Sequence, residues 1–193
     1  EYREQAYHSI YQKRYADGAK LLQSAIALEP NSDDYLLLGD IQEALQQYKA
    51  ARRWYQKGLA TKPDAKSQQS FVYHLATLEA QEFNNLGKAF QLAQQLPENS
   101  PEALLLQALQ AMENKHLNAA LSLTEQVANS SATQEMKGWA HYYAAQAWLA
   151  TGNQDKASGA LFHAVNHARG HGLVDRITRL WEQLRQLPLQ QVP

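Results

Sequence analysis

The sequence contains no cysteine, which excludes disulfide bonds and a thiol nucleophile. Charged residues are also scarce at 19%, and with a net charge of −1 neither sign clusters over long stretches. The chain therefore lacks the electrostatic footprint of a protein that binds nucleic acid or an anionic membrane. Because no apolar run approaches the roughly 18 residues of a membrane span, we expect a soluble protein without direct membrane insertion.

Catalytic signatures are also missing. The sequence has no phosphate-binding G-x-x-x-x-G-K-[ST], no dinucleotide-binding G-x-G-x-x-G and no G-x-S-x-G motif. Neighbouring carboxylates such as Asp33 and Asp34 fit the usual role of acidic residues at the start of a helix. The sequence predicts neither an enzyme nor a cofactor.

A five-point pattern instead recurs after 33 residues. The first copy comprises Tyr15, Gly18, Leu22, Ala25 and Pro30, and the second comprises Tyr48, Ala51, Tyr55, Gly58 and Pro63. Self-similarity of this period indicates one supersecondary unit that stacks on copies of itself, and such stacks usually offer binding surfaces.

The second copy resembles a tetratricopeptide repeat, a helix-turn-helix unit with a W-x2-L-G-x2-Y, A-x3-F and P pattern. The matching residues are Tyr35, Leu38, Gly39, Gln42, Ala51, Tyr55 and Pro63. Small residues are expected at Gly39, Ala51 and Gly58, where two antiparallel helices cross closely.

Three further copies follow with less regular spacing. The small residue of the second helix gives the series Gly18, Ala51, Ala89, Ala120 and Ala157, with steps of 33, 38, 31 and 37 residues. These steps average about 35 residues, near the family value, and we expect turns between helices to absorb the differences. The third copy departs most, with Thr77 in place of glycine and four extra residues at 66–69. Approximate repeat bounds are 1–31, 32–65, 66–99, 100–131 and 132–169.

The fold class expected is all-α, a right-handed superhelical array of about five helix-turn-helix repeats plus a C-terminal capping helix. Asn99 or Ser100 before Pro101 predicts a helix start, and apolar residues then recur at helical spacing. The predicted helices are 2–13, 15–28, 33–46, 48–61, 67–81, 85–96, 101–113, 117–129, 133–150 and 154–169. No segment alternates with the period of a strand.

The last helix has no partner in the repeat pattern. After Gly170 and Gly172, an apolar stripe is expected to run along residues 172–187 until Pro188 ends the helix. A terminal repeat has one face without a neighbour, so we expect the segment 170–193 to contribute a capping helix and a tail. A free partner-binding helix is the alternative.

The resemblance implies that the first helix of each pair lines a concave groove. The groove positions carried over from the family are Arg3, Tyr7, Tyr11, Asp33, Leu36, Asp40, Glu43, Phe71, His74, Leu78, Gln81, Leu105, Leu109, Met112, Trp139, Tyr142, Gln146 and Leu149. They would give an acidic half around Asp40 and Glu43 and a more apolar half around Leu105 and Tyr142. A segment with basic residues at one end and apolar residues at the other would fit. Internal packing of several of these residues is the alternative.

The family's co-chaperone type grips a terminal carboxylate with Lys, Arg and Asn side chains in the groove. The corresponding positions here offer Leu36, Asp40, Phe71 and His74, with only Arg3 of the right sign. The sequence therefore does not predict a receptor for a chaperone tail.

Three histidines, His163, His167 and His171, follow one another at four-residue spacing. His163 and His167 would share one helix face and could supply two ligands to zinc, but a third is needed. We expect ordinary histidines here and no metal site.

The leading hypothesis is a non-catalytic adaptor that binds a segment of a partner protein, with the assembly of a bacterial envelope or secretion complex as an expected setting. The alternative is a regulatory or sensor module of a larger bacterial protein, such as a transcription regulator, which binds a small effector or self-associates. The chain begins with Glu1 rather than Met, which suggests a processed chain or a piece of a longer one. Composition favours the bacterial periplasm slightly over the cytoplasm.

Overall fold

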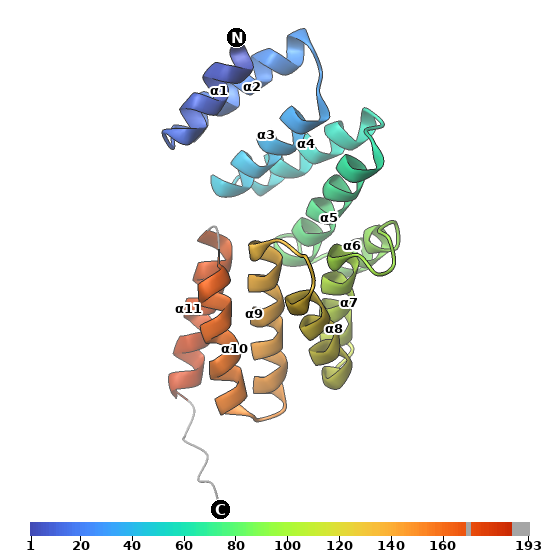
Figure 1. Cartoon of the computed structure of the whole chain (residues 1–193), viewed down its shortest axis with the longest axis vertical. Coiled ribbons are helices and arrows are strands. Elements are labelled where there is room, and N and C mark those ends of the chain that lie inside the picture. Colours follow the sequence, from blue (N-terminus) through green and yellow to red (C-terminus); the bar gives the residue numbers. More distant parts are fainter. Residues whose placement is uncertain (169–170, 187–193) are drawn as a thin grey trace, which may run out of the picture. The chain divides into compact units, whose positions relative to one another are not determined.

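The computed structural model describes residues 1–168 and 171–186, and all regular structure in these ranges is helical (Figure 1). The chain divides into two compact units, Glu1–Leu96 and Pro97–Pro193, here called unit 1 and unit 2. The helices of unit 1 are α1 (Tyr2–Tyr11), α2 (Tyr15–Leu28), α3 (Ser32–Ala44), α4 (Tyr48–Ala60), α5 (Ala65–Gln81) and α6 (Leu86–Ala93). Those of unit 2 are α7 (Pro101–Glu113), α8 (Leu117–Asn129), α9 (Gln134–Ala150), α10 (Gln154–His167) and α11 (His171–Gln186). The all-α prediction is confirmed.

The helices form successive pairs, α1 with α2, α3 with α4 and α5 with α6 in unit 1, then α7 with α8 and α9 with α10 in unit 2. Side chains cap several of their first turns. Ser100 accepts a hydrogen bond from the Ala103 backbone N–H directly before Pro101, as the sequence predicted for Ser100. Asp64 does the same for Ser67 at α5.

Each pair is closed by one residue in the left-handed backbone region. These residues are Lys13, Gln46, Asn84, Lys115 and Gly152, with φ between 50° and 78°. Their numbers differ by 33, 38, 31 and 37, the same steps that the small residues Gly18, Ala51, Ala89, Ala120 and Ala157 show in the sequence. The next backbone N–H reaches back to the end of the preceding helix, as from Arg14 to Ser9. This is the usual hydrogen bond of a Schellman cap.

The expectation that turns absorb the uneven steps is wrong for the two long ones. The helices α5 and α9 have 17 residues each, whereas α3 and α7 have 13. The four extra residues at 66–69 thus lie in the first turns of α5. Since four residues nearly complete one helical turn, the longer helices keep the same face toward their neighbours.

The core of unit 1 has two clusters, and glycines allow its helices to approach closely. A Cβ built on Gly39 of α3 would overlap the ring of Tyr55 from α4. A Cβ built on Gly58 would overlap Phe71 of α5. Leu38 belongs to the first cluster, while Tyr55 and Phe71 belong to the second. The family-based expectation of small residues at Gly39 and Gly58 therefore has a direct steric reason.

Two buried carboxylates also connect the helices of unit 1. Glu79 of α5 is fully enclosed, with its Oε1 atom 2.7 Å from Lys88 Nζ of α6 and 3.4 Å from an Arg52 nitrogen of α4. Asp34 of α3 is also buried, and its Oδ2 accepts a hydrogen bond of 2.7 Å from Arg3 Nε of α1. These ion pairs join elements that are distant in sequence.

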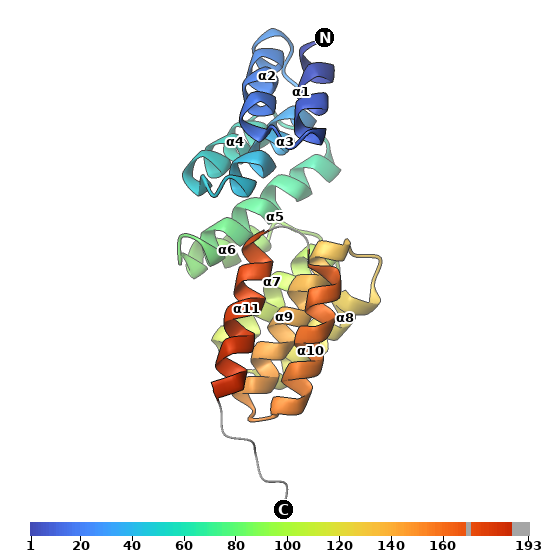
Figure 2. The ribbon, with the colours of Figure 1, turned by 90° about the vertical axis from the view of Figure 1, so that its left-hand side faces the viewer.

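In unit 2, α11 lies alongside α9 and α10 (Figures 1 and 2). It turns an apolar stripe inward, in which Leu173, Ile177, Leu180 and Leu184 are buried. Leu173 approaches Gly138 of α9, where a Cβ would lie 2.9 Å from its Cδ2 atom. The packed inner face agrees with the capping role expected for residues 172–187. The expected features at Gly170, Leu187 and Pro188 lie outside the described residues.

None of the helices in the described ranges is both long and apolar enough to cross a membrane.

Candidate functional site

The groove positions expected from the sequence fall into three groups by exposure. Tyr7 and Tyr11 of α1 and Asp33 of α3 are exposed, Tyr11 at 88% of its surface. The half-buried members are Arg3, Leu36, Asp40, Glu43, His74, Gln81, Leu109, Met112, Trp139, Gln146 and Leu149. Phe71, Leu78, Leu105 and Tyr142 are buried.

The burial of Phe71, Leu78 and Leu105 corrects the groove expectation for these three. Phe71 fills the space beside Gly58, and Leu78 belongs to the same core cluster. Leu105 is exposed over only 2% of its surface. Because these side chains are part of the core, a partner cannot reach them without rearrangement of the helices.

The acidic residues of unit 1 form a compact cluster around Tyr55. The Tyr55 hydroxyl of α4 lies 2.7 Å from Asp40 Oδ1 and 2.8 Å from Glu43 Oε1 of α3. A phenol has only one proton to donate, so it can satisfy only one of these two carboxylates at a time. Asp40 and Glu43 remain 45% and 32% exposed, so both are within reach of a ligand.

His74 of α5 completes this acidic cluster. Its ring stacks on Tyr55 with centroids 4.9 Å apart. Its nitrogens lie 3.9 Å from Asp40 Oδ1 and 3.7 Å from Glu43 Oε1, and these pairs are ionic only when His74 is protonated. When His74 is neutral, it contributes no positive charge to the two carboxylates.

The surroundings of the acidic cluster shift its proton affinities. Burial raises the pKa of Asp40, against the lowering effects of His74 and of the Tyr55 hydroxyl. Burial, with the two neighbouring carboxylates, strongly raises the pKa of Tyr55. Tyr55 therefore stays protonated and donates, and a cation between Asp40 and Glu43 would relieve their repulsion.

Arg3 has its charge compensated within unit 1. Its guanidinium pairs with Asp34 and Glu29, at 2.7 Å and 3.0 Å, and also donates to the Glu29 carbonyl oxygen. The hydrogen bond to Asp34, followed by that to Glu29, raises the pKa of Arg3 further. Arg3 is thus committed to joining α1 to α3, which leaves it poorly suited to gripping a partner's carboxylate.

The corresponding surface of unit 2 is aromatic and bears arginines. Trp139 of α9 packs edge-on against Tyr142, with ring centroids 5.8 Å apart. The Arg176 guanidinium of α11 lies 5.8 Å from the centre of the Trp139 ring. Burial raises the pKa of Tyr142, while the positive charges of Arg176 and Arg179 lower it. Because Tyr142 is largely buried, Trp139, Tyr142 and Leu149 do not form the contiguous exposed patch that would favour self-association.

A second histidine arrangement appears between α9 and α10. The His141 ring lies 5.3 Å from that of His163 and 5.5 Å from that of His167, and it stacks nearly parallel to the latter. Burial, followed by these two histidines and Lys137, lowers the pKa of His141 to about 4. In the part of the chain that the structure describes, no group of three or more His, Cys, Asp or Glu side chains is arranged to hold a metal ion.

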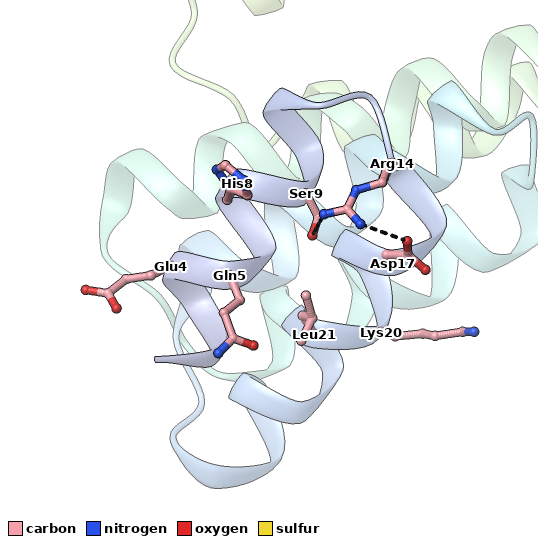
Figure 3. Close-up of a pocket in the computed structure, with 8 residues that line it drawn as sticks. All are labelled: Glu4, Gln5, His8, Ser9, Arg14, Asp17, Lys20 and Leu21. Atoms are coloured by element: carbon pink, nitrogen blue, oxygen red, sulfur yellow. Dashed lines mark hydrogen bonds and ion pairs between the residues drawn. The ribbon is translucent and has the colours of Figure 1, made fainter.

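A pocket of about 680 Å³ lies on the first helix pair (Figure 3). It is lined by Glu4, Gln5, His8, Ser9, Arg14, Asp17, Lys20 and Leu21. Arg14 lies 3.9 Å from Asp17 and 3.5 Å from the Ser9 hydroxyl, so part of this surface is internally satisfied. The open pocket mixes charges of both signs and does not select one class of ligand.

Sequence reasoning missed three contributors to these surfaces. Tyr55 was assigned only to packing, although its hydroxyl joins the two carboxylates. Arg176 and Arg179 of the last helix are not among the groove positions expected from the sequence. The sequence offers no local signal for their proximity to Tyr142, which depends on how α11 docks on α9.

Residues 9–72 match the family model for the tetratricopeptide repeat. No curated protein matches the sequence. Similar solved structures include PilW, a type IV pilus biogenesis factor, at 13% identity, TM-score 0.66, and coverage of 95% of this chain and 90% of that one. TTC0263, a tetratricopeptide-repeat protein of Thermus thermophilus, has 15% identity, TM-score 0.64, and coverage of 94% and 97%.

YrrB, a tetratricopeptide-repeat protein described as having an unusual peptide-binding site, has 20% identity and TM-score 0.55, with 92% of this chain and 90% of that one covered. At such identities these likenesses establish the fold alone. The family match is thus confined to residues 9–72, while the solved structures show that the chain as a whole has the fold of tetratricopeptide-repeat proteins.

Proposed function

We propose that this protein is a non-catalytic adaptor that binds a segment of a partner protein. The acidic cluster, defined as Asp40, Glu43, Tyr55 and His74, would receive a lysine or arginine of that segment. Tetratricopeptide repeats generally mediate protein–protein interaction, and the sequence lacks the phosphate-binding, dinucleotide-binding and G-x-S-x-G motifs. The similarity to a type IV pilus biogenesis factor supports a role in bacterial envelope or secretion assemblies.

The observation that carries this proposal is the shared hydroxyl of Tyr55. Two part-exposed carboxylates converge on one donor, so one carboxylate lacks a proton donor from Tyr55. A basic side chain would supply further donors and a positive charge to this pair of carboxylates. Charge-assisted hydrogen bonds of this kind are stronger than neutral ones, particularly beside partly buried acids.

The exposed aromatic side chains of α1 extend the proposed binding surface within unit 1. Tyr7 and Tyr11 are separated by four residues and therefore lie on one face of the helix. Tyrosines in such positions offer apolar contact area and a polar tip, which is typical of interface residues. We propose that they contact the partner segment, while Asp40 and Glu43 fix its basic residue.

The test is affinity capture from a bacterial lysate with the full chain, compared with an Asp40→Asn, Glu43→Gln variant. The amide side chains keep the shape of the cluster and can still accept from Tyr55, but they remove both negative charges. We expect mass spectrometry to identify a partner that the wild type retains and the variant loses by about tenfold or more.

The matched control is Glu4→Gln, Asp17→Asn, which removes the same charge from two exposed positions of unit 1 outside the expected groove. It should retain the partner. Equal capture by wild type and the cluster variant would show that the acidic cluster is not the binding site. Capture of nothing by the folded wild type would contradict the adaptor function and favour the regulatory module.

A further inference from the structure

Several hydrogen-bond donors lie on α9 and α11 of unit 2, whereas the acidic cluster of unit 1 offers carboxylate acceptors. Gln146 Nε2 donates to the Tyr142 hydroxyl oxygen at 3.1 Å. The hydroxyl proton of Tyr142 has no acceptor among the described residues. Because burial raises the pKa of Tyr142, this proton stays in place and can be donated to a ligand.

Two arginines lie one helical turn apart on α11, and Arg176 stands over the ring of Trp139, which packs against Tyr142. The positive charges of Arg176 and Arg179 lower the pKa of Tyr142. Arg179 is exposed, and its only hydrogen bond within the described ranges runs from Nε to the Asp175 backbone oxygen at 3.3 Å. The terminal nitrogens of Arg179 thus remain available as donors.

An aromatic side chain, Trp139, lies next to these donors. Trp139 packs against Tyr142 and lies beneath the Arg176 guanidinium. The Trp139 side chain is only half-buried, so a ligand can contact it. Aromatic rings beside arginine are the combination most often found where a binding interface concentrates its energy.

We infer that unit 2 binds an acidic peptide segment, with an Asp or Glu carboxylate held by Arg179 and the Tyr142 hydroxyl beside the positive charge of Arg176, and an apolar side chain against Trp139. Arginine suits this role because its planar fork of donors matches the two oxygens of a carboxylate. The helix α11 then contributes to ligand recognition in addition to covering the end of the repeat array. This inference rests on the proposed adaptor function and specifies the chemistry of a second recognition surface.

The test begins with selection of a random dodecapeptide library on the immobilised full chain. We expect two enriched classes, a basic one for the acidic cluster and a second one rich in Asp and Glu next to an apolar residue. Representatives of the acidic class are then synthesised with a fluorescent label, and their affinities for the wild type and variants are measured by anisotropy.

The informative variant is Arg176→Gln, Arg179→Gln. It should lose about tenfold or more in affinity for the acidic peptides and keep its affinity for the basic ones, because single charge-assisted contacts are of this size. Arg53→Gln, Arg185→Gln is the matched control, since it removes the same charge from exposed positions away from Tyr142. Circular dichroism and thermal unfolding establish that both variants are folded.

The possible failures are distinguishable. Recovery of peptides without an acidic class, or acidic peptides that bind the Arg176→Gln, Arg179→Gln variant as tightly as the wild type, would overturn this inference and leave the adaptor function intact. Recovery of no peptide class by the folded wild type would contradict both.

Discussion

The two units of this protein stabilise the same repeat architecture with different interiors. Unit 1 buries two carboxylates, Asp34 and Glu79, whose partners come from other helices. Among the described residues of unit 2, none of the charged side chains is buried. The repeat fold therefore does not require buried charge, and we expect the stability of unit 1 to be more sensitive than that of unit 2 to the loss of single charges.

The largest effect should follow from removal of both cations around Glu79. An Arg52→Met, Lys88→Met variant leaves a buried carboxylate without a counter-charge, and we expect unit 1 to lose about 3–5 kcal/mol of stability. Hydrogen exchange read by mass spectrometry should show faster exchange in α4, α5 and α6, with unit 2 much less affected.

Two further variants make this test specific. Lys49→Met, Arg53→Met replaces the same residue types at more exposed positions and should change stability by less than about 0.5 kcal/mol per site. Adding Glu79→Leu to the double variant should restore most of the loss, because no unpaired charge remains. A double variant as stable as its exposed control would contradict the importance of buried charge in unit 1.

A smaller difference is expected from glycine substitutions in the two units. Gly39→Ala would place a methyl group inside the Tyr55 ring, which is enclosed, and should cost about 2–3 kcal/mol. Gly138→Ala would meet the Leu173 Cδ2 atom at 2.9 Å and the His167 backbone at 3.3 Å, a milder overlap than at Gly39, and should cost about 1 kcal/mol.

Gly159→Ala is the control for these glycine variants because nothing lies within 4 Å of the added methyl group. It should leave stability unchanged or raise it by up to about 1 kcal/mol, the difference in helix propensity. Chemical denaturation measures all three. Equal losses of stability for Gly39→Ala and Gly138→Ala would mean that both units accommodate an added methyl group equally well.

The smallest expected effect is the loss of stability of unit 2 at acidic pH. The pKa of His141 in unit 2 is about 4, below the ordinary value of 6.5, so the unfolded chain binds a proton more readily between these two pH values. The contribution of His141 to the free energy of unfolding is complete above pH 6.5 and is lost as the pH falls toward 4. Allowing for its partial exposure, we expect about 1 kcal/mol, or a few degrees in melting temperature between about pH 7.5 and 5.

A His141→Gln variant cannot take up this proton, so its melting temperature should fall less over the same pH range. Asp40 in unit 1 acts in the opposite sense, because its raised pKa disfavours the charged form and acidification relieves that cost. An identical acid response in the wild type and His141→Gln would exclude His141 as the cause.

Local sequence patterns predicted where the helices lie, but they did not predict how deeply single side chains are buried or how the helices pack on one another. The repeat spacing and Pro101 placed helix ends near their observed positions, since caps and apolar periodicity act over a few residues. Phe71 was expected in the groove but is buried, because its depth is set by Gly58 on another helix. The binding residues stay predictions for the same reason, since the position of α11 beside α9 depends on tertiary packing that no local pattern in the sequence specifies.

The extra helical turn in α5 and α9 has a consequence for how this array could evolve or be redesigned. An insertion of four residues rotates the following side chains by only about 40°, whereas one of two residues turns them by about 200° and would reverse the packed face. Lineages and designs should therefore tolerate length changes inside these helices in whole turns. The first helix of a pair is then expected to change its length by whole turns, as between the 13 residues of α3 and α7 and the 17 residues of α5 and α9.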